Sequence, residues 1–130
     1  KPLIVAANKA DMPGAKERIN KLKKKYKDVI IIPTSAQAEL ALKMAAKQGL
    51  IEYVPGDSKF KVLKPESLNE KQKQALEYIQ KNVLDVYGST GVQELLDKAV
   101  FDLLGYVAVF PGGSKLEDKE GRVLPDCFLM

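Results

Sequence analysis

The tetrapeptide Asn8-Lys9-Ala10-Asp11 directly follows an apolar segment and carries side chains suited to binding a purine base. Guanine presents two adjacent donors, its ring imino group and its exocyclic amino group, and the carboxylate of Asp11 can accept both hydrogen bonds. Adenine offers no such pair, so buried hydrogen bonds of this kind reject the wrong base. Asn8 can brace the loop and bond the imidazole side of the ring, while the aliphatic stem of Lys9 can lie over the base.

A second short motif, Thr34-Ser35-Ala36, also follows an apolar segment, and its serine comes 24 residues after Asp11. The carboxyl ends of parallel strands meet at one edge of a sheet, where the ligands of α/β proteins bind. We expect Ser35 to hydrogen-bond Asp11 and hold it, and the main-chain amide of Ala36 to donate to the guanine carbonyl oxygen. The alternative is that the two motifs are a polar turn and an ordinary helix cap.

The elements that position these loops form a predicted βαβ unit of the α/β class. Residues 3–7 and 29–33 are continuous apolar runs bounded by turn residues, which is typical of strands covered on both faces of a parallel sheet. Residues 15–27 predict the crossover helix between them, and the Ala-rich residues 37–48 predict a second helix. An isolated two-stranded pair is only marginally stable, so we expect the chain to be part of a larger protein.

The middle of the chain predicts a helical pair. Ser67 with Glu70, and Thr90 with Gln93, match the capping box that satisfies the first amides of a helix. Apolar residues recur at intervals of three, four or eight in the first helix and with a 3.6-residue period in the second, which predicts that both helices bury one face. The segment Gly88–Gly91 between them is interpreted as a helix–helix turn, the alternative being an anion-binding nest.

The segments around this pair predict short strands and turns. Residues 50–66 form a predicted connector with a short strand at 60–63. Residues 106–110 and 122–130 predict two further strands. The sequence Gly112-Gly113-Ser114-Lys115 lacks the upstream glycine of a phosphate-binding loop and predicts a turn.

The positive charge of the chain is concentrated in one segment. The 130 residues have a formal net charge of +4, but residues 16–28 alone contain seven basic and two acidic side chains. These lysines are interpreted either as a solvated helix face or as phosphate contacts to ribosomal RNA, which need no base sequence. Arg18 and Arg122 are the only arginines, which argues against readout of bases and against DNA specificity.

Composition excludes several other classes of protein. Hydrophobic residues make up 45% of the sequence, too many for a disordered tail, and no apolar run reaches the roughly 18 residues of a membrane span. The chain has no histidine and one cysteine, which excludes ordinary zinc sites, histidine-based triads and internal disulfides. Cys127 lies in an apolar context and is expected to be inert, and a cytoplasmic location is expected.

Longer strings around these motifs resemble a known family. The chain resembles the archaeal branch of the Obg-related, YchF-type P-loop GTPases in ANKAD (7–11), PTSAQAELALKMAAKQGLIEYVPG (33–56), YGSTGVQELLDKAVFDLL (87–104) and GRVLPDCFLM (121–130). The resemblance implies that residues 1–50 are the C-terminal part of a doubly wound GTPase domain with the base-specificity loops. It further implies that residues 51–105 are a connector and helical pair packing on that domain, and that residues 106–130 begin a TGS-like β-grasp domain.

The resemblance also implies a ligand and partners. It assigns GTP as the nucleotide, Asn8, Lys9, Asp11, Ser35 and Ala36 as the residues that bind it, and the ribosome or ribosomal RNA as a partner. Mg²⁺ is expected in the whole protein through residues outside this chain. Bacterial and eukaryotic members of the YchF branch have an altered base motif and use ATP, whereas the intact motif with Asp11 favours GTP here.

Motifs for phosphate chemistry are missing from the sequence. There is no GxxxxGK[ST] loop, and Asp102-Leu103-Leu104-Gly105 matches the phosphate-sensing DxxG pattern in letters but falls on a predicted amphipathic helix. No metal ligand and no catalytic residue is assigned, so the chain alone is expected to be inactive as a hydrolase. Two alternatives to nucleotide recognition are an RNA- or ribosome-binding module without nucleotide dependence and a structural helical adaptor.

Overall fold

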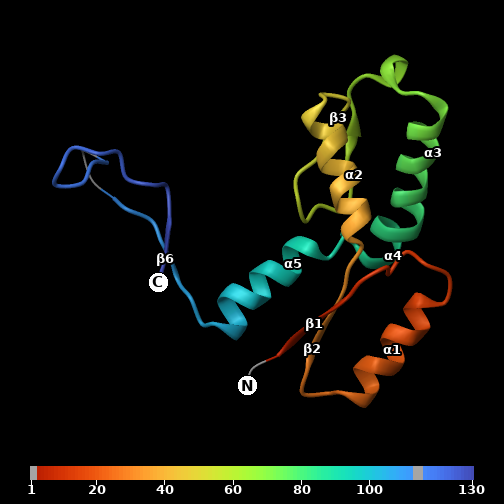
Figure 1. Cartoon of the computed structure of the whole chain (residues 1–130), viewed down its shortest axis with the longest axis horizontal. Coiled ribbons are helices and arrows are strands. Elements are labelled where there is room, and N and C mark those ends of the chain that lie inside the picture. Colours follow the sequence, from red (N-terminus) through yellow and green to blue (C-terminus); the bar gives the residue numbers. More distant parts are fainter. Residues whose placement is uncertain (1–2, 113–115) are drawn as a thin grey trace.

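The first third of the chain forms the predicted βαβ unit. The computed structural model describes residues 3–112 and 116–130, and Figure 1 shows its course. Strands β1 (Ile4–Ala7) and β2 (Ile30–Pro33) pair in parallel, and helix α1 (Ala15–Lys25) connects them. The two strands therefore end at the same edge, which brings the loops that follow them together.

The two strands of this unit differ in burial. Ile31 and Ile32 of β2 are buried, as predicted, whereas Ala6 of β1 is exposed and the preceding Leu3 is 60% exposed. The prediction of a strand covered on both faces is therefore wrong for β1. Within the described residues the sheet has only these two strands, and no further strand pairs with the outer edge of β1.

The connector after the second helix contains a small hairpin. Helix α2 (Ala36–Lys47) is followed by β3 (Ile51–Glu52), which pairs antiparallel with β4 (Lys61–Val62). Strand β4 lies inside the predicted strand at 60–63. Strand β3 was not predicted, because two residues are too few to show an alternating pattern.

The first helix of the pair is one long helical run with a wide turn in it. Helix α3 (Glu70–Ile79) continues through the π-helical turn η2 (Gln80–Leu84) into α4 (Asp85–Tyr87). In Figure 1 this run stands beside α2, with the β3–β4 hairpin on the same body. The run ends at Gly88, as predicted.

The predicted capping box at Ser67 and Glu70 is wrong by two residues. Asn69 is the cap: its side chain accepts from the Gln72 amide over 2.8 Å, and the Gln72 side chain accepts from the Asn69 amide over 3.0 Å. Ser67 instead ends the 3₁₀ turn η1 (Pro65–Ser67), which Pro65 initiates. Asn-x-x-Gln supplies the same reciprocal bonds as Ser-x-x-Glu, and the proline-led turn decides between them.

The second helix begins with α5 (Val92–Asp97) and continues as the π-helical segment η3 (Lys98–Leu103). Its predicted capping box is also wrong, because Gly91 occupies the N-cap position and the Thr90 side chain bonds Glu39 instead.

The apolar face of this second helix is not buried, contrary to the prediction. None of the residues of α5 and η3 is buried, and Leu96, Phe101 and Leu104 are 54%, 42% and 58% exposed. Other apolar residues of these two segments, such as Leu95 and Leu103, are half-buried. Periodicity predicted the helix correctly but does not report how far other elements of the described chain cover its apolar face.

The core lies between α2, β3 and the α3–η2 run. Leu42, Ile51, Val83 and Leu84 are at most 2% exposed, and each such side chain contributes about 1.5–3 kcal/mol by leaving water. A second, smaller cluster joins the first loop to α1 and contains Ala10, Ala15 and Ile19.

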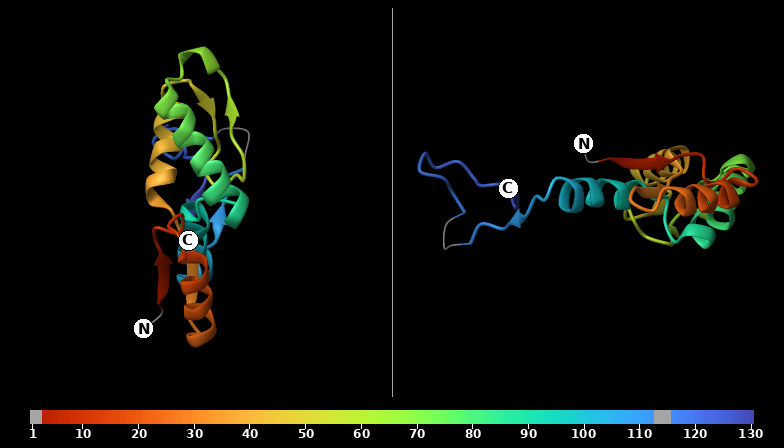
Figure 2. Two further views of the ribbon diagram at one scale, coloured as in Figure 1. Left: turned by 90° about the vertical axis from the view of Figure 1, so that its right-hand side faces the viewer. Right: turned by 90° about the horizontal axis from the view of Figure 1, so that it is seen from below.

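The C-terminal segment lies apart from this body, beyond the end of η3 (Figures 1 and 2). Strands β5 (Ala108–Val109) and β6 (Phe128–Leu129) pair antiparallel, each within a longer strand that the sequence predicted. The turn predicted at 112–115 falls largely on residues outside those described. Among the described residues, no helix is long and apolar enough to cross a membrane.

Candidate base-recognition site

Main-chain hydrogen bonds continue the pairing of β1 and β2 into the two loops that follow them. The Thr34 amide donates to the Ala7 carbonyl over 3.0 Å, and the Ala10 amide donates to the Thr34 carbonyl over 3.0 Å. The loops at 8–11 and 34–36 are therefore fixed side by side, where the sequence placed them.

Side chains of the two motifs also join the loops. The Ser35 hydroxyl donates to Asp11 Oδ1 over 3.0 Å, which confirms the predicted contact. The Ala36 amide donates to Asn8 Oδ1 over 3.1 Å, so Asn8 braces the loops against each other. The Ala36 amide was predicted to face a guanine oxygen, and in this structure its partner is Asn8.

The motif residues surround a hollow of about 250 Å³. Four of the five predicted site residues line it, and Ala36 adjoins it through its bond to Asn8. The hollow also has two lining residues that the sequence did not predict. Its lining consists of Asn8, Lys9, Asp11, Met12, Ser35 and Gln37.

Lys9 has an unusual backbone in this loop. Its φ is 61°, in the left-handed region, and no other non-glycine residue of the described chain has positive φ. Such a conformation costs on the order of 1–3 kcal/mol and is retained at sites where it orients a side chain. The Lys9 side chain is exposed beside the hollow, as a shelf for a base requires.

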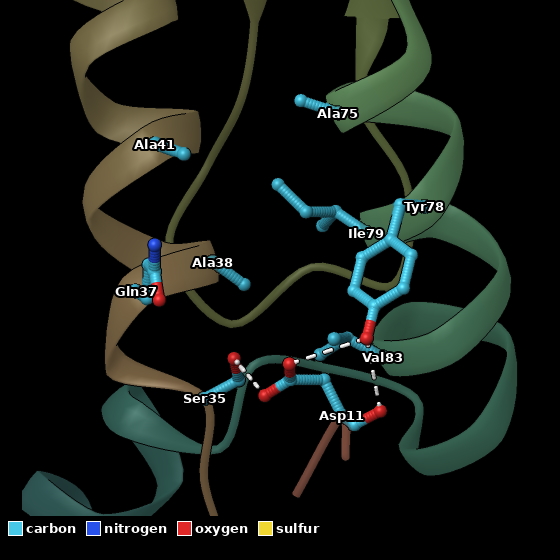
Figure 3. A pocket seen from close by; sticks show the side chains of 9 residues that line it. All are labelled: Asp11, Ser35, Gln37, Ala38, Ala41, Ala75, Tyr78, Ile79 and Val83. Carbon is cyan, nitrogen blue, oxygen red and sulfur yellow. Dashed lines mark hydrogen bonds between the residues drawn. The ribbon is translucent and has the colours of Figure 1, made fainter. Parts of the chain in front are cut away.

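Two tyrosines of the α3–α4 run hold the first loop from its other side. The Tyr78 hydroxyl donates to the Asp11 main-chain oxygen over 3.2 Å and lies 3.4 Å from Asp11 Oδ2 (Figure 3). The Tyr87 hydroxyl donates to the Ala10 carbonyl over 2.8 Å. Burial, and secondly the nearby Asp11 carboxylate, raise the pKa of Tyr87, so its hydroxyl stays a donor.

A second hollow, of about 220 Å³, lies between α2 and α3 and shares Asp11, Ser35 and Gln37 with the first. Figure 3 shows Tyr78 and Ile79 facing Ala38 and Ala41 across it, with Asp11 and Ser35 at one end. Apart from these polar residues its walls are mostly small or aliphatic. The Asp11 carboxylate therefore lies where the two hollows adjoin.

The second loop is anchored to the turn before α5. The Ser35 amide donates to the Thr90 carbonyl over 2.9 Å, and the Thr90 hydroxyl donates to Glu39 Oε2. Tyr53 donates to the same Glu39 oxygen over 2.7 Å. Burial first, then the bond to Glu39, raises the pKa of Tyr53 to about 12. This buried cluster ties the start of α2 to two later segments.

Sequence reasoning found both motifs but not the residues that support them. Gln37 directly follows the second motif and could have been included on position alone. Tyr78, Tyr87 and Thr90 lie 67, 77 and 51 residues from the groups that they bond. Nothing in their local pattern distinguishes them from other residues of the helices and turns.

Three other residues that the sequence suggested for chemistry, Asp102, Cys127 and Ser89, do not line this site. Asp102 pairs with Lys98 over 3.0 Å along the helix, which agrees with its structural interpretation. Cys127 lies in the C-terminal hairpin segment. Ser89 bonds the Gly91 amide over 3.1 Å, as in a helix–helix turn.

Comparison with known proteins identifies the family. Residues 6–113 match the family described as Obg-like GTPase YGR210-like, G4 motif-containing domain. The chain belongs to this family. The matched residues include both loops of the candidate site, the β3–β4 hairpin and the helical pair.

Relatives are found in archaea and yeast. An uncharacterized GTP-binding protein of Methanocaldococcus jannaschii is 50% identical over the whole chain, and one of Schizosaccharomyces pombe is 36% identical over 85% of it. The crystal structure of a GTP binding protein from Pyrococcus horikoshii OT3 matches the whole chain with a TM-score of 0.65 and 42% identity. The chain spans 33%, 28% and 32% of these three proteins, respectively.

Proposed function

We propose that this G4 domain recognises the guanine base of GTP for a larger GTP-binding protein. The observation that carries the proposal is the bond from Ser35 to Asp11 Oδ1, which joins two loops at the common edge of parallel strands beside a hollow. The GTP-binding names of the relatives support the same ligand.

The chemistry of the site fits guanine. The Asp11 carboxylate is held by Ser35 and retains acceptor sites for the imino and amino donors of the base. The Lys9 stem supplies an apolar shelf beside it. The Ala36 amide now bonds Asn8, and on base binding we expect it to share its hydrogen with the guanine carbonyl oxygen.

The phosphates would be held elsewhere in the larger protein. Among residues 3–112 and 116–130 no group of three or more His, Cys, Asp or Glu side chains could hold a metal ion, and the sequence contains no GxxxxGK[ST] loop. Tight binding and hydrolysis would therefore depend on a phosphate-binding loop and Mg²⁺ ligands outside this chain, in a translation-associated, cytoplasmic GTPase.

We further propose a division of the chain that follows the family resemblance. Residues 1–50 contribute the base loops of the GTPase domain, and residues 51–105 form the connector and helical pair packed on it. Residues 106–130 begin a TGS-like domain. The hydrogen bonds of Tyr78, Tyr87 and Thr90 support the packing of the second part on the first.

The test is equilibrium binding of GTP and ATP to the full-length native protein. We expect at least about 10²-fold preference for GTP, because the two donors of guanine meet a charged acceptor and adenine has no matching pair. Equal affinity for the two nucleotides would contradict guanine recognition by this site.

A second candidate function is RNA contact through α1. Its last turn contains Lys23, Lys24 and Lys25, all exposed, and none of the ion pairs among the described residues uses a lysine of α1. Unpaired lysines on one helix favour binding to phosphate groups. This function is compatible with base recognition, because the two surfaces use different residues.

A further inference from the structure

Tyr78 directs its hydroxyl toward Asp11, the base acceptor of the proposed function, although its side chain is partly exposed. The residue is 45% exposed, yet its hydroxyl donates to the Asp11 main-chain oxygen and lies 3.4 Å from Asp11 Oδ2. Figure 3 shows the ring extending from α3 with its hydroxyl over Asp11. The contact links residues 67 positions apart in the sequence.

The hydrogen-bond capacity of Asp11 suggests what this contact does. A carboxylate has about four acceptor sites, two on each oxygen. Ser35 uses one on Oδ1, and Tyr78 approaches one on Oδ2 while sharing its hydrogen with the main-chain oxygen. One site then remains on each oxygen. The two adjacent donors of guanine need such a pair.

Two contacts are also what is needed to fix the carboxylate plane. The terminal torsion of an aspartate side chain is broad, so a single bond from Ser35 leaves the group free to turn. Tyr78 restrains the other oxygen and, through the main-chain oxygen, the loop itself.

We propose that Tyr78 is a positioning residue that sets base specificity by orienting Asp11. The proposal rests on the proposed function, because it concerns the same site. It makes α3, which lies outside the two base motifs, a determinant of which purine is accepted.

Tyr87 provides a matched control. Its hydroxyl anchors the same loop, through the Ala10 carbonyl over 2.8 Å, without touching the carboxylate. Tyr87→Phe therefore tests loop anchoring, whereas Tyr78→Phe tests both anchoring and the orientation of Asp11. Each substitution removes one hydroxyl and keeps the ring.

The experiment measures the dissociation constants of GTP and inosine triphosphate with the full-length native protein and both variants. Inosine lacks the exocyclic amino group, so the ratio of the two constants reports whether the second carboxylate oxygen is in place. We expect Tyr78→Phe to lower the preference for GTP by about three- to tenfold, the loss of one hydrogen bond. Tyr87→Phe should weaken the binding of both nucleotides equally and leave the preference for GTP over inosine triphosphate unchanged.

Three results would overturn the role of Tyr78: an unchanged preference in Tyr78→Phe, an equal change in both variants, or tighter GTP binding without the hydroxyl. These results are distinguishable from failure of the proposed function. If the unmodified protein binds no guanine nucleotide, the base site itself is refuted, and the role of Tyr78 with it.

Discussion

The Ser35 amide donates to the Thr90 carbonyl over 2.9 Å, which attaches the second base loop to the turn that precedes α5. Gly91 completes this contact, since its own main chain lies directly against that of Pro33. The site is thus held by two distant segments, with the α3–α4 run on the first loop and the 88–91 turn on the second. The two loops of the candidate site and the packing of the helical pair are consequently linked.

The close approach at Gly91 predicts an intolerant position. A Cβ at Gly91 would lie 1.9 Å from the Pro33 carbonyl oxygen, and φ there is 79°. We expect Gly91→Ala to lower the free energy of unfolding by at least about 3 kcal/mol, because backbone must move. Gly88→Ala is the control: φ is 82°, but a methyl group meets nothing within 4 Å, so it should cost only about 1–2 kcal/mol. Equal losses in denaturant unfolding would show that the contact with Pro33 is unimportant.

The buried cluster around Glu39 predicts a loss of stability in alkali. The pKa of Tyr53 is raised from 10.0 to about 12 in the folded protein. A raised pKa means that the folded state holds the proton more tightly, so this contribution to stability is complete below pH 10 and is lost as the pH rises toward about 12. We expect Tyr53→Phe to be less stable than the parent at neutral pH but to lose less stability over this interval. Parallel curves in denaturant titrations at each pH would contradict the role of Tyr53.

Charge reversal on α1 tests the second candidate function. Replacing Lys23, Lys24 and Lys25 with glutamate should weaken RNA binding by the full-length native protein about tenfold or more and flatten its dependence on salt. The measurement is a series of RNA titrations at increasing salt concentration. A control with the same change in charge carries glutamate at three exposed lysines of the connector, Lys59, Lys61 and Lys64. If the unmodified protein binds RNA with no dependence on salt, or if the control weakens binding equally, α1 is not the contact surface.

The two loops of the candidate site could be placed from the sequence, because their position follows from neighbouring residues and from strand pairing. Two apolar runs predicted β1 and β2, their parallel pairing followed from the crossover helix, and the contact from Ser35 to Asp11 followed from both. Each step uses residues next to one another along the chain or along one sheet edge. The roles of the motif residues in nucleotide binding remain a prediction.

The errors arise where the structure depends on distant partners. The local pattern predicts that Thr90 caps a helix, but its hydroxyl donates to the buried Glu39 carboxylate instead. Leu96 and Leu104 have the spacing of core residues, yet both are more than half exposed. Tyr78 was unremarkable in sequence because its partner is 67 residues away. Such contacts require the three-dimensional arrangement.

The most direct test of guanine recognition is Asp11→Asn in the full-length native protein, with the affinities for GTP and xanthosine triphosphate measured side by side. Xanthine replaces the exocyclic amino donor of guanine with a carbonyl acceptor, which an asparagine amide can satisfy and a carboxylate cannot. We expect the affinity for GTP to fall by at least about 10²-fold and the affinity for xanthosine triphosphate to rise. An unchanged preference for GTP in Asp11→Asn would remove Asp11 from the site and contradict the account.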